Sequence, residues 1–502
     1  MACLDRLVLV LNLAVLLLGA GLAEAAPVPP QRLTDDPRVR AALAQLDAQF
    51  AEVLAKENLP GMSAGVVYDQ ELIWSKGYGY ADIERKLAAD AETVYDIGSV
   101  TKMFNATMLM QLRDAGKLSL DDPIEKYLPE FHFRSRFPDS APPTFRQVVA
   151  HVGGLPREYE TDGTSATEVR QPPADEVLAG LGGKELTYPP LTAIHYSNLG
   201  IYLMGQALQR IAGQPYKDYV REHILLPLGM THTDWDLTEE MKTHYAVGYR
   251  PAGPDGSRPV GPPWIAGDFG MPAGGLYSSV EDLAKFLSLQ FRGGPVAGGQ
   301  ILSGSTLREM RAPIFLSDDW RSAFGVGWGL GRRGGHLTVG HGGGNPSYCS
   351  YLSFAPDLRF GVVILINQET PEQYPIGDKA MDTLIPAFEA VKADYDAQEL
   401  SRLLKIAEGY QGRYRLAAMG VDCDLVVRDR SVLLLPLLGP GEAAEEIEFV
   451  PEDEQHLRLV RGFGYNTGEV AVFSRSPNTG AVTFRVLGLV LERVSDTPVP
   501  PE

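Results

Sequence analysis

The spacing of apolar residues predicts a chain with two parts of different secondary structure. After Asp36, apolar residues recur on one helix face until the helix-breaking stretch 58–61. Residues 62–68 and 71–80 then form two apolar-rich runs joined at Asp69 and Gln70, which predicts a β-hairpin. The apolar face of the helix consists of Val39, Ala42, Leu43, Leu46, Phe50, Val53 and Leu54.

A second patterned helix is predicted to begin at Ser99 and to end near Gly116. Its apolar face consists of Met103, Phe104, Met108, Leu109 and Leu112. Strands at the two ends of this part and helices in its middle predict an α+β domain over residues 27–395, with one sheet closed by both termini. The later expected helices are 144–150, 199–212, 216–228, 280–290 and 378–397, and the later strands are 324–330, 337–340, 348–355 and 360–366.

The pattern changes from about Arg402, where short strand-like runs replace the helices. Turn residues such as those at 439–441 and 477–480 separate the runs, which is typical of a small antiparallel barrel or sandwich. We therefore expect a C-terminal all-β domain over residues 402–498. The expected strands are 410–415, 424–427, 432–435, 447–450, 457–460, 470–474, 482–486 and 490–494.

The N-terminal residues 1–26 have the pattern of a secretory signal peptide. The stretch 7–22 is apolar except for Asn12, and the small residues of 23–25 follow at cleavage spacing. This run is shorter than the ~20 residues that span a bilayer, so we expect cleavage and secretion to an extracytoplasmic location. The alternative is an uncleaved segment that anchors the protein to a membrane.

Composition restricts the partners that the chain can be expected to bind. The 502 residues include 64 acidic and 45 basic side chains, and the formal net charge is −19. This balance argues against nucleic acid or an anionic membrane surface as the main partner, because both require basic patches. Once Cys3 leaves with the signal, Cys349 and Cys423 remain, and we expect two free buried thiols. No cysteine and histidine cluster has zinc spacing, so no metal is expected.

The first candidate for chemistry is the Ser-x-x-Lys sequence of Ser99 and Lys102. Residues three apart lie one above the other on a helix, so the Lys102 amine can approach the Ser99 hydroxyl. A desolvated lysine can lose its proton near neutral pH and then serve as the base that activates a serine. The alternative is an ordinary helix start with a capping serine and a surface lysine.

Two further motifs could complete such a site. Tyr196 and Asn198 form the Tyr-x-Asn of the chain. A tyrosine beside a lysine ammonium can have its phenol pKa lowered. An asparagine side chain can bind a substrate amide. The stretch His341 to Asn345 carries three glycines between two predicted strands, so a substrate could approach the backbone closely and the Gly344 N–H could stabilise an oxyanion. Each motif taken alone is also compatible with a simple turn.

Ser63 is a rival nucleophile, because residues 61–65 match the Gly-x-Ser-x-Gly pattern. That pattern requires a preceding strand and a following helix, whereas here a helix precedes and a strand follows. We therefore interpret Ser63 as an ordinary strand residue.

Taken together, the three motifs resemble those of the serine β-lactamase and penicillin-binding-protein superfamily, in particular its class C and esterase-like branch. The resemblance extends over roughly residues 38–390 and includes the stretches 98–102, 273–276, 324–328, 340–343 and 364–367. It implies an α/β/α sandwich with an antiparallel sheet and a helical insertion. The region after residue 402 resembles a lipocalin-like domain appended to some peptidases of this superfamily.

The resemblance also implies roles for the motif residues and an acyl-enzyme mechanism without metal or cofactor. Ser99 would be the nucleophile, Lys102 its base and Tyr196 the proton shuttle. Asn198 would orient the substrate, and the N–H groups of Ser99 and Gly344 would form the oxyanion hole. The third motif, with His341 and Gly343, would complete the substrate-binding side.

Two departures from the family pattern affect the expected substrate. The loop 152–156 lacks the hydroxyl side chain often found beside the site, and His341 stands where many members have lysine. A neutral histidine holds a carboxylate less firmly than lysine, which favours an esterase or peptidase over a penicillinase. We expect a small-molecule or peptide substrate, with a pocket wall built from 161–190 and 245–263. The alternative from another functional class is a catalytically silent binding or scaffold protein that keeps the fold.

Overall fold

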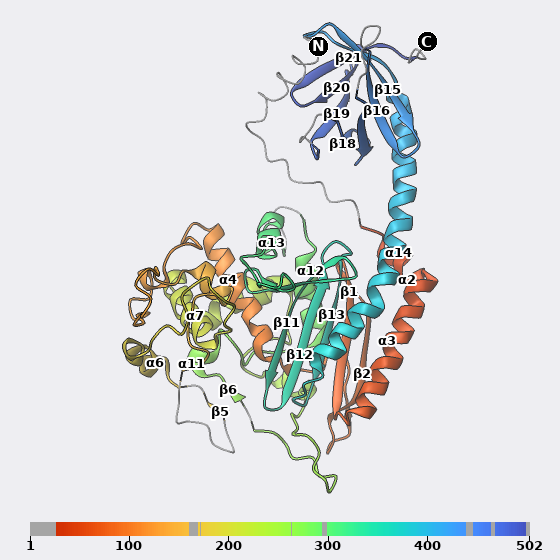
Figure 1. The fold of residues 1–502 in the computed structure, drawn as a ribbon. Helices are drawn as coiled ribbons and strands as arrows, with labels where there is room; N and C mark the ends of the chain where they lie inside the picture. Colours follow the sequence, from red (N-terminus) through yellow and green to blue (C-terminus); the bar gives the residue numbers. More distant parts are fainter. Residues whose placement is uncertain are drawn as a thin grey trace. The chain divides into compact units, whose positions relative to one another are not determined.

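The computed structural model describes residues 27–497 except 160–168, 171, 263, 294–298, 438–444 and 463–466. The expected signal peptide, residues 1–26, lies outside these ranges. The chain divides into two compact units, one formed by Pro29–Glu389 and one containing the chain from Ala390 onward (Figure 1). No helix within the described ranges is both long enough and apolar enough to cross a membrane.

The first unit is built on a nine-stranded sheet with the order β3-β2-β1-β13-β12-β11-β10-β9-β8. The earliest and latest long strands are neighbours in it, since Met62 of β1 lies opposite Ile366 of β13. The prediction of a sheet closed by both ends of the domain is therefore confirmed. The strands are β1 (Gly61–Tyr68), β2 (Glu71–Asp82), β3 (Leu87–Ala88), β8 (Phe315–Leu316), β9 (Ala323–Phe324), β10 (Gly329–Arg333), β11 (His336–Asn345), β12 (Tyr348–Ala355) and β13 (Phe360–Ile366).

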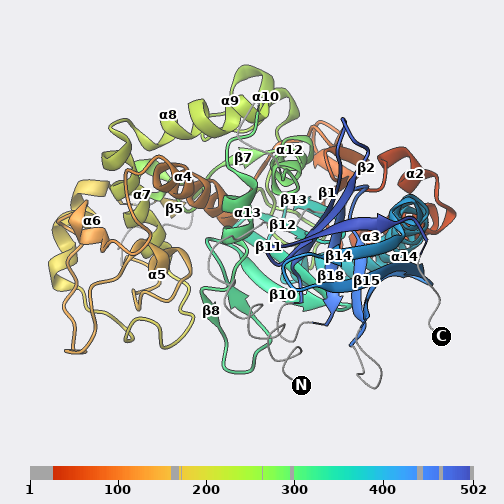
Figure 2. The same ribbon diagram turned by 90° about the horizontal axis from the view of Figure 1, so that it is seen from above.

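Helices cover both faces of this sheet and form the expected α/β/α sandwich (Figure 2). On one face lie α3 (Pro37–Lys56) and the first part of α14 (Gln373–Ala407), whose Phe388 ring packs 4.4 Å from that of Phe360. On the other face lies α12 (Val280–Gln290), with α4 (Lys102–Asp114) against it. The Phe286 ring of α12 stacks 4.5 Å from that of Phe104 in α4, so these helices share one apolar core.

The middle of the first unit is largely helical, as the sequence pattern indicates. The longest of these helices, α7, has an N-cap in Ser197 and ends at Gly213, which adopts the left-handed conformation at φ +77°. Helix α7 packs against α4 and α5. The helices here are α5 (Phe145–Val149), α6 (Ala174–Gly180), α7 (Asn198–Ala212), α8 (Tyr216–Val220), α9 (Leu226–Leu228), α10 (Glu239–His244), α11 (Gly267–Gly270) and α13 (Gly304–Met310).

Several predicted boundaries near the middle strands were wrong. The expected strand 324–330 is two strands, β9 and β10, separated by a turn at Gly327, where φ is +78°. The expected strand 337–340 continues through the glycine stretch to Asn345, so this stretch is part of β11 and does not lie between strands. The last helix begins at Gln373 rather than at 378, with Pro375 in its first turn, where a missing N–H costs no helical hydrogen bond.

The second unit contains a closed antiparallel barrel, as expected for a small all-β domain. Its eight strands follow chain order, and β14 pairs with β21 to close the ring. Alternate side chains such as Tyr414, Phe449 and Phe484 fill the interior. The strands are β14 (Gly412–Leu416), β15 (Val421–Arg428), β16 (Ser431–Leu437), β17 (Ile447–Pro451), β18 (His456–Arg461), β19 (Val470–Arg475), β20 (Val482–Val486) and β21 (Leu489–Ser495).

The two remaining cysteines are free and buried, as predicted. Cys349 lies in β12 of the first unit and Cys423 in β15 of the barrel. Burial raises the pKa of each thiol to about 12, so neither is a reactive thiolate at neutral pH.

Truncating Phe286 to alanine is expected to destabilise the first unit by about 3–5 kcal/mol, because the side chain is fully buried between Phe104 and Trp328. All five tryptophans lie in this unit, so tryptophan fluorescence during urea unfolding reports on it alone. Leu226→Ala is the control, since that side chain is 71% exposed and should change stability by less than ~0.5 kcal/mol. Equal effects of the two variants would contradict this core.

Candidate active site

Ser99 lies in a tight turn at the start of α4 rather than in the helix itself. The turn is a 3₁₀-helix, Gly98–Thr101, and α4 continues from Lys102. Gly98 has φ +49°, and its N–H donates to Asp96 Oδ1 at 2.8 Å. The expectation that Ser99 opens the α-helix is wrong by about one turn. Gly98, in the left-handed conformation, starts a tighter 3₁₀-helix that contains Ser99, and the α-helix follows it.

Lys102 points back onto Ser99, as the three-residue spacing predicts. Its Nζ lies 2.9 Å from Ser99 Oγ and donates to the carbonyl of Ala273 at 2.8 Å. The side chain is buried, and burial lowers the pKa of the amine to about 7, with Glu158 opposing and Arg157 adding to the effect. An amine with this pKa is partly unprotonated at neutral pH and can accept a proton.

Tyr196 lies against the same amine. The Lys102 Nζ is 5.0 Å from the centre of the Tyr196 ring, and the Arg157 guanidinium is 5.2 Å from it. Burial nevertheless raises the pKa of the Tyr196 phenol above its ordinary value. The hydrogen bond with Ser99 lowers this pKa, but by less than burial raises it. The expectation of a lowered phenol pKa is therefore wrong, because removal from water outweighs the nearby charges. Tyr196 is a neutral proton donor at neutral pH.

A loop of residues 151–158, the supporting loop, fixes the segment that carries Tyr196. The His151 ring packs 4.2 Å from the Tyr196 ring, and its Nδ1 accepts a hydrogen bond from the Ser197 N–H at 3.2 Å. Ser197 Oγ donates to the Pro156 carbonyl at 2.6 Å, and the Arg157 carbonyl accepts from the backbone of residues 198 and 199. His151 holds a left-handed backbone at φ +59°, a costly conformation for a non-glycine residue. The loop therefore acts as a rigid support.

The glycine stretch of β11 lies directly against the Ser99 turn. A Cβ on Gly343 would come within 2.1 Å of the Ile97 carbonyl and 2.9 Å of the Ser99 nitrogen. A Cβ on Gly98 would come within 2.7 Å of the Gly344 nitrogen. These approaches are possible only without side chains, and they bring the backbone nitrogens of Ser99 and Gly344 to the same place.

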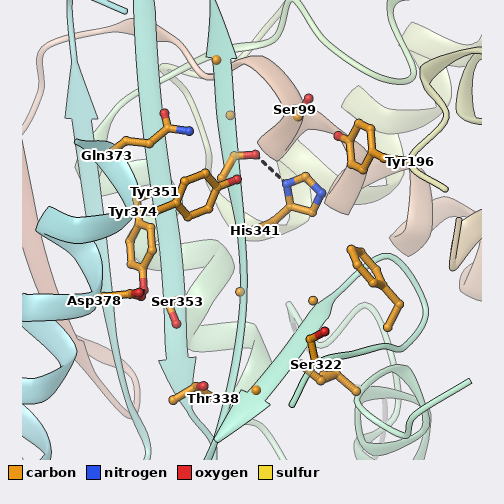
Figure 3. Close-up of a pocket in the computed structure, with 18 of the residues that line it drawn as sticks. Ser99, Tyr196, Ser322, Thr338, His341, Tyr351, Ser353, Gln373, Tyr374 and Asp378 are labelled. Carbon is orange, nitrogen blue, oxygen red and sulfur yellow. Dashed lines mark hydrogen bonds between the residues drawn. The ribbon is translucent and has the colours of Figure 1, made fainter. Parts of the chain in front are cut away.

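His341 lies beside this backbone, near Ser99 and Tyr196 (Figure 3). Its Nδ1 is 2.7 Å from the Gly342 carbonyl, which can only accept, so this nitrogen carries the proton. Burial lowers the pKa of the His341 ring to about 4, with the Lys102 charge adding to the effect. His341 is therefore neutral at neutral pH, and its Nε2 is a hydrogen-bond acceptor.

Asn198 is near the other motif residues but does not line the cavity. Its Nδ2 donates to Glu158 of the supporting loop, and its Oδ1 is buried without a partner among the described residues. The structure therefore brings together Ser99, Lys102, Tyr196 and the β11 glycines, and it turns the Asn198 amide toward Glu158. Sequence spacing gives no sign of this contact, because residue 158 is brought close only by folding.

A cavity of about 860 Å³ opens at Ser99 and runs along β11 (Figure 3). Ser99, Tyr196, His341, Gly343 and Gly344 line it, and none of the described residues in 161–190 or 245–263 does. For the described residues of these ranges, the expected source of the pocket wall is thus wrong for this cavity; 161–168, 171 and 263 lie outside the described residues. The described wall comes from the start of α14, from β9 and β10, from the loop before β9 and from the supporting loop. Sequence reasoning missed these wall residues: Arg157, Arg321, Phe324, Arg332, Arg333, Gln373, Tyr374 and Asp378.

The start of α14 is the most informative of the missed elements. Its Tyr374 hydroxyl lies so close to Gly342 that a Cβ there would come within 2.5 Å of it. The prolines at 371 and 375 obscure the helix pattern in this stretch, so only the position of the helix relative to β11 shows the contact. Among the described residues, no group of three or more His, Cys, Asp or Glu side chains is placed to hold a metal ion.

Comparison with known proteins shows the family of this chain. The Beta-lactamase family model matches residues 46–384, which is more than half of the chain. The chain belongs to the Beta-lactamase family. This family segment contains Ser99, Lys102, Tyr196 and the β11 glycines.

Curated proteins similar to this chain are 28–29% identical to it over the matched residues. Beta-lactamase-like protein 2 of Dictyostelium discoideum is 29% identical over 382 residues, which is 75% of this chain and 68% of that protein. Protein flp of Staphylococcus aureus is 28% identical over 339 residues, which is 67% of this chain and 64% of that protein. The match therefore spans slightly less than two thirds of the length of Protein flp.

Solved structures of other proteins show the same fold. The octameric penicillin-binding protein homologue from Pyrococcus abyssi has a TM-score of 0.59 at 25% identity, and the match covers 90% of this chain and 100% of that one. The class C beta lactamase from Rhodobacter sphaeroides has a TM-score of 0.57 at 20% identity, covering 68% of this chain and 98% of that one. The first match is long enough to include part of the second unit.

Replacing Lys102 by methionine is expected to raise stability most at low pH. The native amine has a pKa of about 7 and an unfolded lysine about 10.5, so between these values only the unfolded state binds the proton. The wild type therefore gains stability as pH rises through this window, by about 1.4 kcal/mol per unit. The advantage of Lys102→Met in urea unfolding should shrink from pH 8 to pH 10, and a constant difference would show that Lys102 is protonated in the native state.

Proposed function

We propose that this protein is a secreted serine hydrolase that acts through an acyl-enzyme on an ester or a small amide or peptide. The observation that carries the proposal is the position of the buried Lys102 amine, 2.9 Å from the Ser99 hydroxyl, with its pKa lowered to about 7. A serine needs a base at hydrogen-bond distance and with a pKa near the working pH, and Lys102 meets both conditions.

The reaction begins when Ser99 Oγ attacks the carbonyl carbon of the substrate and its proton passes to the unprotonated Lys102 amine. The negative charge that develops on the carbonyl oxygen is stabilised by the N–H groups of Ser99 and Gly344. One such donor is typically worth about 10²–10³ in rate. The close approach of Gly98 to the Gly344 nitrogen, and of Gly343 to the Ser99 nitrogen, supports this arrangement of the two donors.

The tetrahedral intermediate collapses when the bond to the leaving group breaks and that group takes a proton. Tyr196 donates this proton and takes another from the Lys102 ammonium; its neutral phenol and the position of its ring against the Lys102 amine support this role. An acyl group then remains on Ser99. Water releases it by the same steps in reverse, with Lys102 or Tyr196 taking the proton of the attacking water.

The neutral state of His341 supports the choice of an ester or peptide rather than a penicillin. A neutral ring whose Nε2 is an acceptor repels a carboxylate instead of pairing with it. Among the structural neighbours, one is titled a D-alanine carboxypeptidase AmpC, from Burkholderia cenocepacia, with a TM-score of 0.57 at 20% identity over 69% of this chain. That name is a precedent for cleaving an amide bond on this fold but not for the leaving group, because a carboxypeptidase substrate carries the terminal carboxylate that a neutral His341 disfavours. The signal-like segment 1–26 supports secretion.

Replacing Ser99 by alanine should abolish turnover of p-nitrophenyl esters, with kcat/KM falling by at least ~10³, because no other nucleophile lies beside Lys102 in the described site. The matched control is Ser305→Ala, an exposed serine on α13, which should retain full activity. Undiminished ester hydrolysis by the Ser99 variant would contradict the proposal. Absence of turnover by the wild type across esters, D-amino-acid peptides and nitrocefin would favour the silent scaffold.

The pH dependence of kcat/KM should show a rising limb with an apparent pKa near 7. Below this pH Lys102 is protonated and cannot accept the Ser99 proton, and above it the base is free. The buried phenol of Tyr196 keeps its proton to a higher pH than an ordinary tyrosine does, because burial raises its pKa. No falling limb is therefore expected below pH 10. A profile that is flat between pH 5.5 and 8.5 would exclude Lys102 as the base.

A further inference from the structure

Two arginines lie on neighbouring strands at the end of the cavity that is remote from Ser99. Ala323 of β9 is paired with Leu330 of β10 in an antiparallel ladder. Continuing this register by two residues places Arg321 directly opposite Arg332, on the same face of the sheet. Both side chains line the cavity, and we call these two residues the arginine pair.

No ion pair joins either guanidinium of the arginine pair to a carboxylate in the described part of the chain. Arg332 is exposed, and its Nη1 donates to the carbonyl of Gly335 at 3.2 Å. Asp319, the acidic residue nearest to Arg321 in the chain, accepts from the Arg321 N–H at 3.0 Å and from the Ser317 hydroxyl at 2.6 Å. Like charges directly opposite each other on a sheet are unfavourable, so an anion bound between them would stabilise the pair.

The two acidic side chains among the described residues that line this cavity do not neutralise the arginine pair. Asp378 is already paired with Arg333, whose Nη2 lies 2.9 Å from it. Glu369 lies near Cys349, which is opposite Gly344 at the other end of β11. The far end of the cavity is therefore positively charged, although the chain as a whole has a net charge of −19.

The arginine pair lies far from the reacting bond along β11. Arg332 is opposite Leu337, and Gly344, which is proposed to hold the oxyanion, follows seven residues after Leu337. With a rise of ~3.3 Å per residue, this separation is about 20 Å. Figure 3 shows Thr338, the neighbour of Leu337, at the end of the lining residues away from Ser99.

The leaving group is the part of the substrate that extends toward this end. In the proposed reaction Tyr196 protonates the leaving group, and its ring centre lies 6.1 Å from that of His341. His341 stands between Leu337 and Gly344 in β11. A substrate with its scissile carbonyl at Ser99 therefore directs its leaving group along β11 toward the arginine pair.

We propose that the arginine pair binds an anionic group, a carboxylate or a phosphate monoester, at the end of a long leaving group. This inference rests on the proposed function, because it assumes that the scissile carbonyl lies between Ser99 and Gly344. It is compatible with the neutral His341, which disfavours a carboxylate next to the scissile bond but not one about 20 Å away. The substrate is thereby narrowed to elongated esters or amides with negative charge remote from the reacting bond.

The test uses three acetyl thioesters that share a tetraethylene-glycol thiol as leaving group and differ only in its terminal group: a carboxylate, a phosphate monoester or a neutral carboxamide. Hydrolysis is followed by the release of the thiol. At low ionic strength the wild type should have a kcat/KM about 5-fold higher for at least one charged thioester than for the carboxamide, and the preferred one identifies the anion. This preference should fall in about 0.5 M NaCl, because salt screens exposed charges.

Arg321→Gln and Arg332→Gln each remove one charge from the arginine pair and keep a polar side chain. Each should reduce the preference to about 2-fold or less and leave kcat/KM for the carboxamide thioester within about 2-fold. Arg332→Lys keeps the charge and should keep most of the preference. The matched control is Arg308→Gln, which removes the same charge from an exposed position on α13 that does not line the cavity, and it should change neither value.

The outcomes separate the inference from the proposed function. Equal kcat/KM for all three thioesters in the wild type overturns the anion site while the hydrolase stands, and so does a preference that survives in both glutamine variants or falls equally in Arg308→Gln. Turnover of p-nitrophenyl esters without turnover of either charged thioester overturns it as well. If the wild type hydrolyses neither the thioesters nor any other acyl donor, the proposed function itself fails. Retained folding of each variant is checked by its tryptophan fluorescence during urea unfolding.

Discussion

The burial of one amine beside one hydroxyl is the constraint on which the active region depends. Lys102 is removed from water by α4, the loop carrying Ala273 and the ring of Tyr196. This burial destabilises the charged form of the amine, and the fold compensates with the packed core of α4, α7 and α12. The resulting pKa of about 7 is what makes a lysine suitable as a base at neutral pH.

The second requirement is that two distant segments of backbone meet at Ser99. Gly98 precedes Ser99, and Gly343 and Gly344 lie almost 250 residues later in β11, yet side chains on Gly98 or Gly343 would collide with the opposite segment. The nine-stranded sheet positions β11 for this contact, and the Ser350 hydroxyl of β12 donates to the Ile97 carbonyl at 2.7 Å to hold it. The backbone arrangement proposed to hold the oxyanion is therefore a product of tertiary structure and not of a local motif.

Sequence patterns predicted the elements that show either an unbroken apolar run or a regular alternation of apolar and polar residues. The fully buried runs β12 and β13 were placed with the observed boundaries, all eight barrel strands were found, and Ser63 lies in strand β1 as interpreted. The pattern failed where glycine or proline interrupts it, as in the end of β11 and the start of α14. The three-residue spacing also predicted the contact between Lys102 and Ser99, because that contact is local.

The rest of the site depends on contacts between remote segments, which no spacing reveals. The Asn198 amide faces Glu158 instead of the cavity, and the phenol pKa of Tyr196 is raised by burial that a sequence does not display. The most direct test of the central claim is mass spectrometry of the wild type trapped with a slowly released acyl donor, followed by peptide mapping. The account predicts one acyl group on the peptide at Ser99. An acyl group on another residue, or turnover without any covalent intermediate, would contradict it.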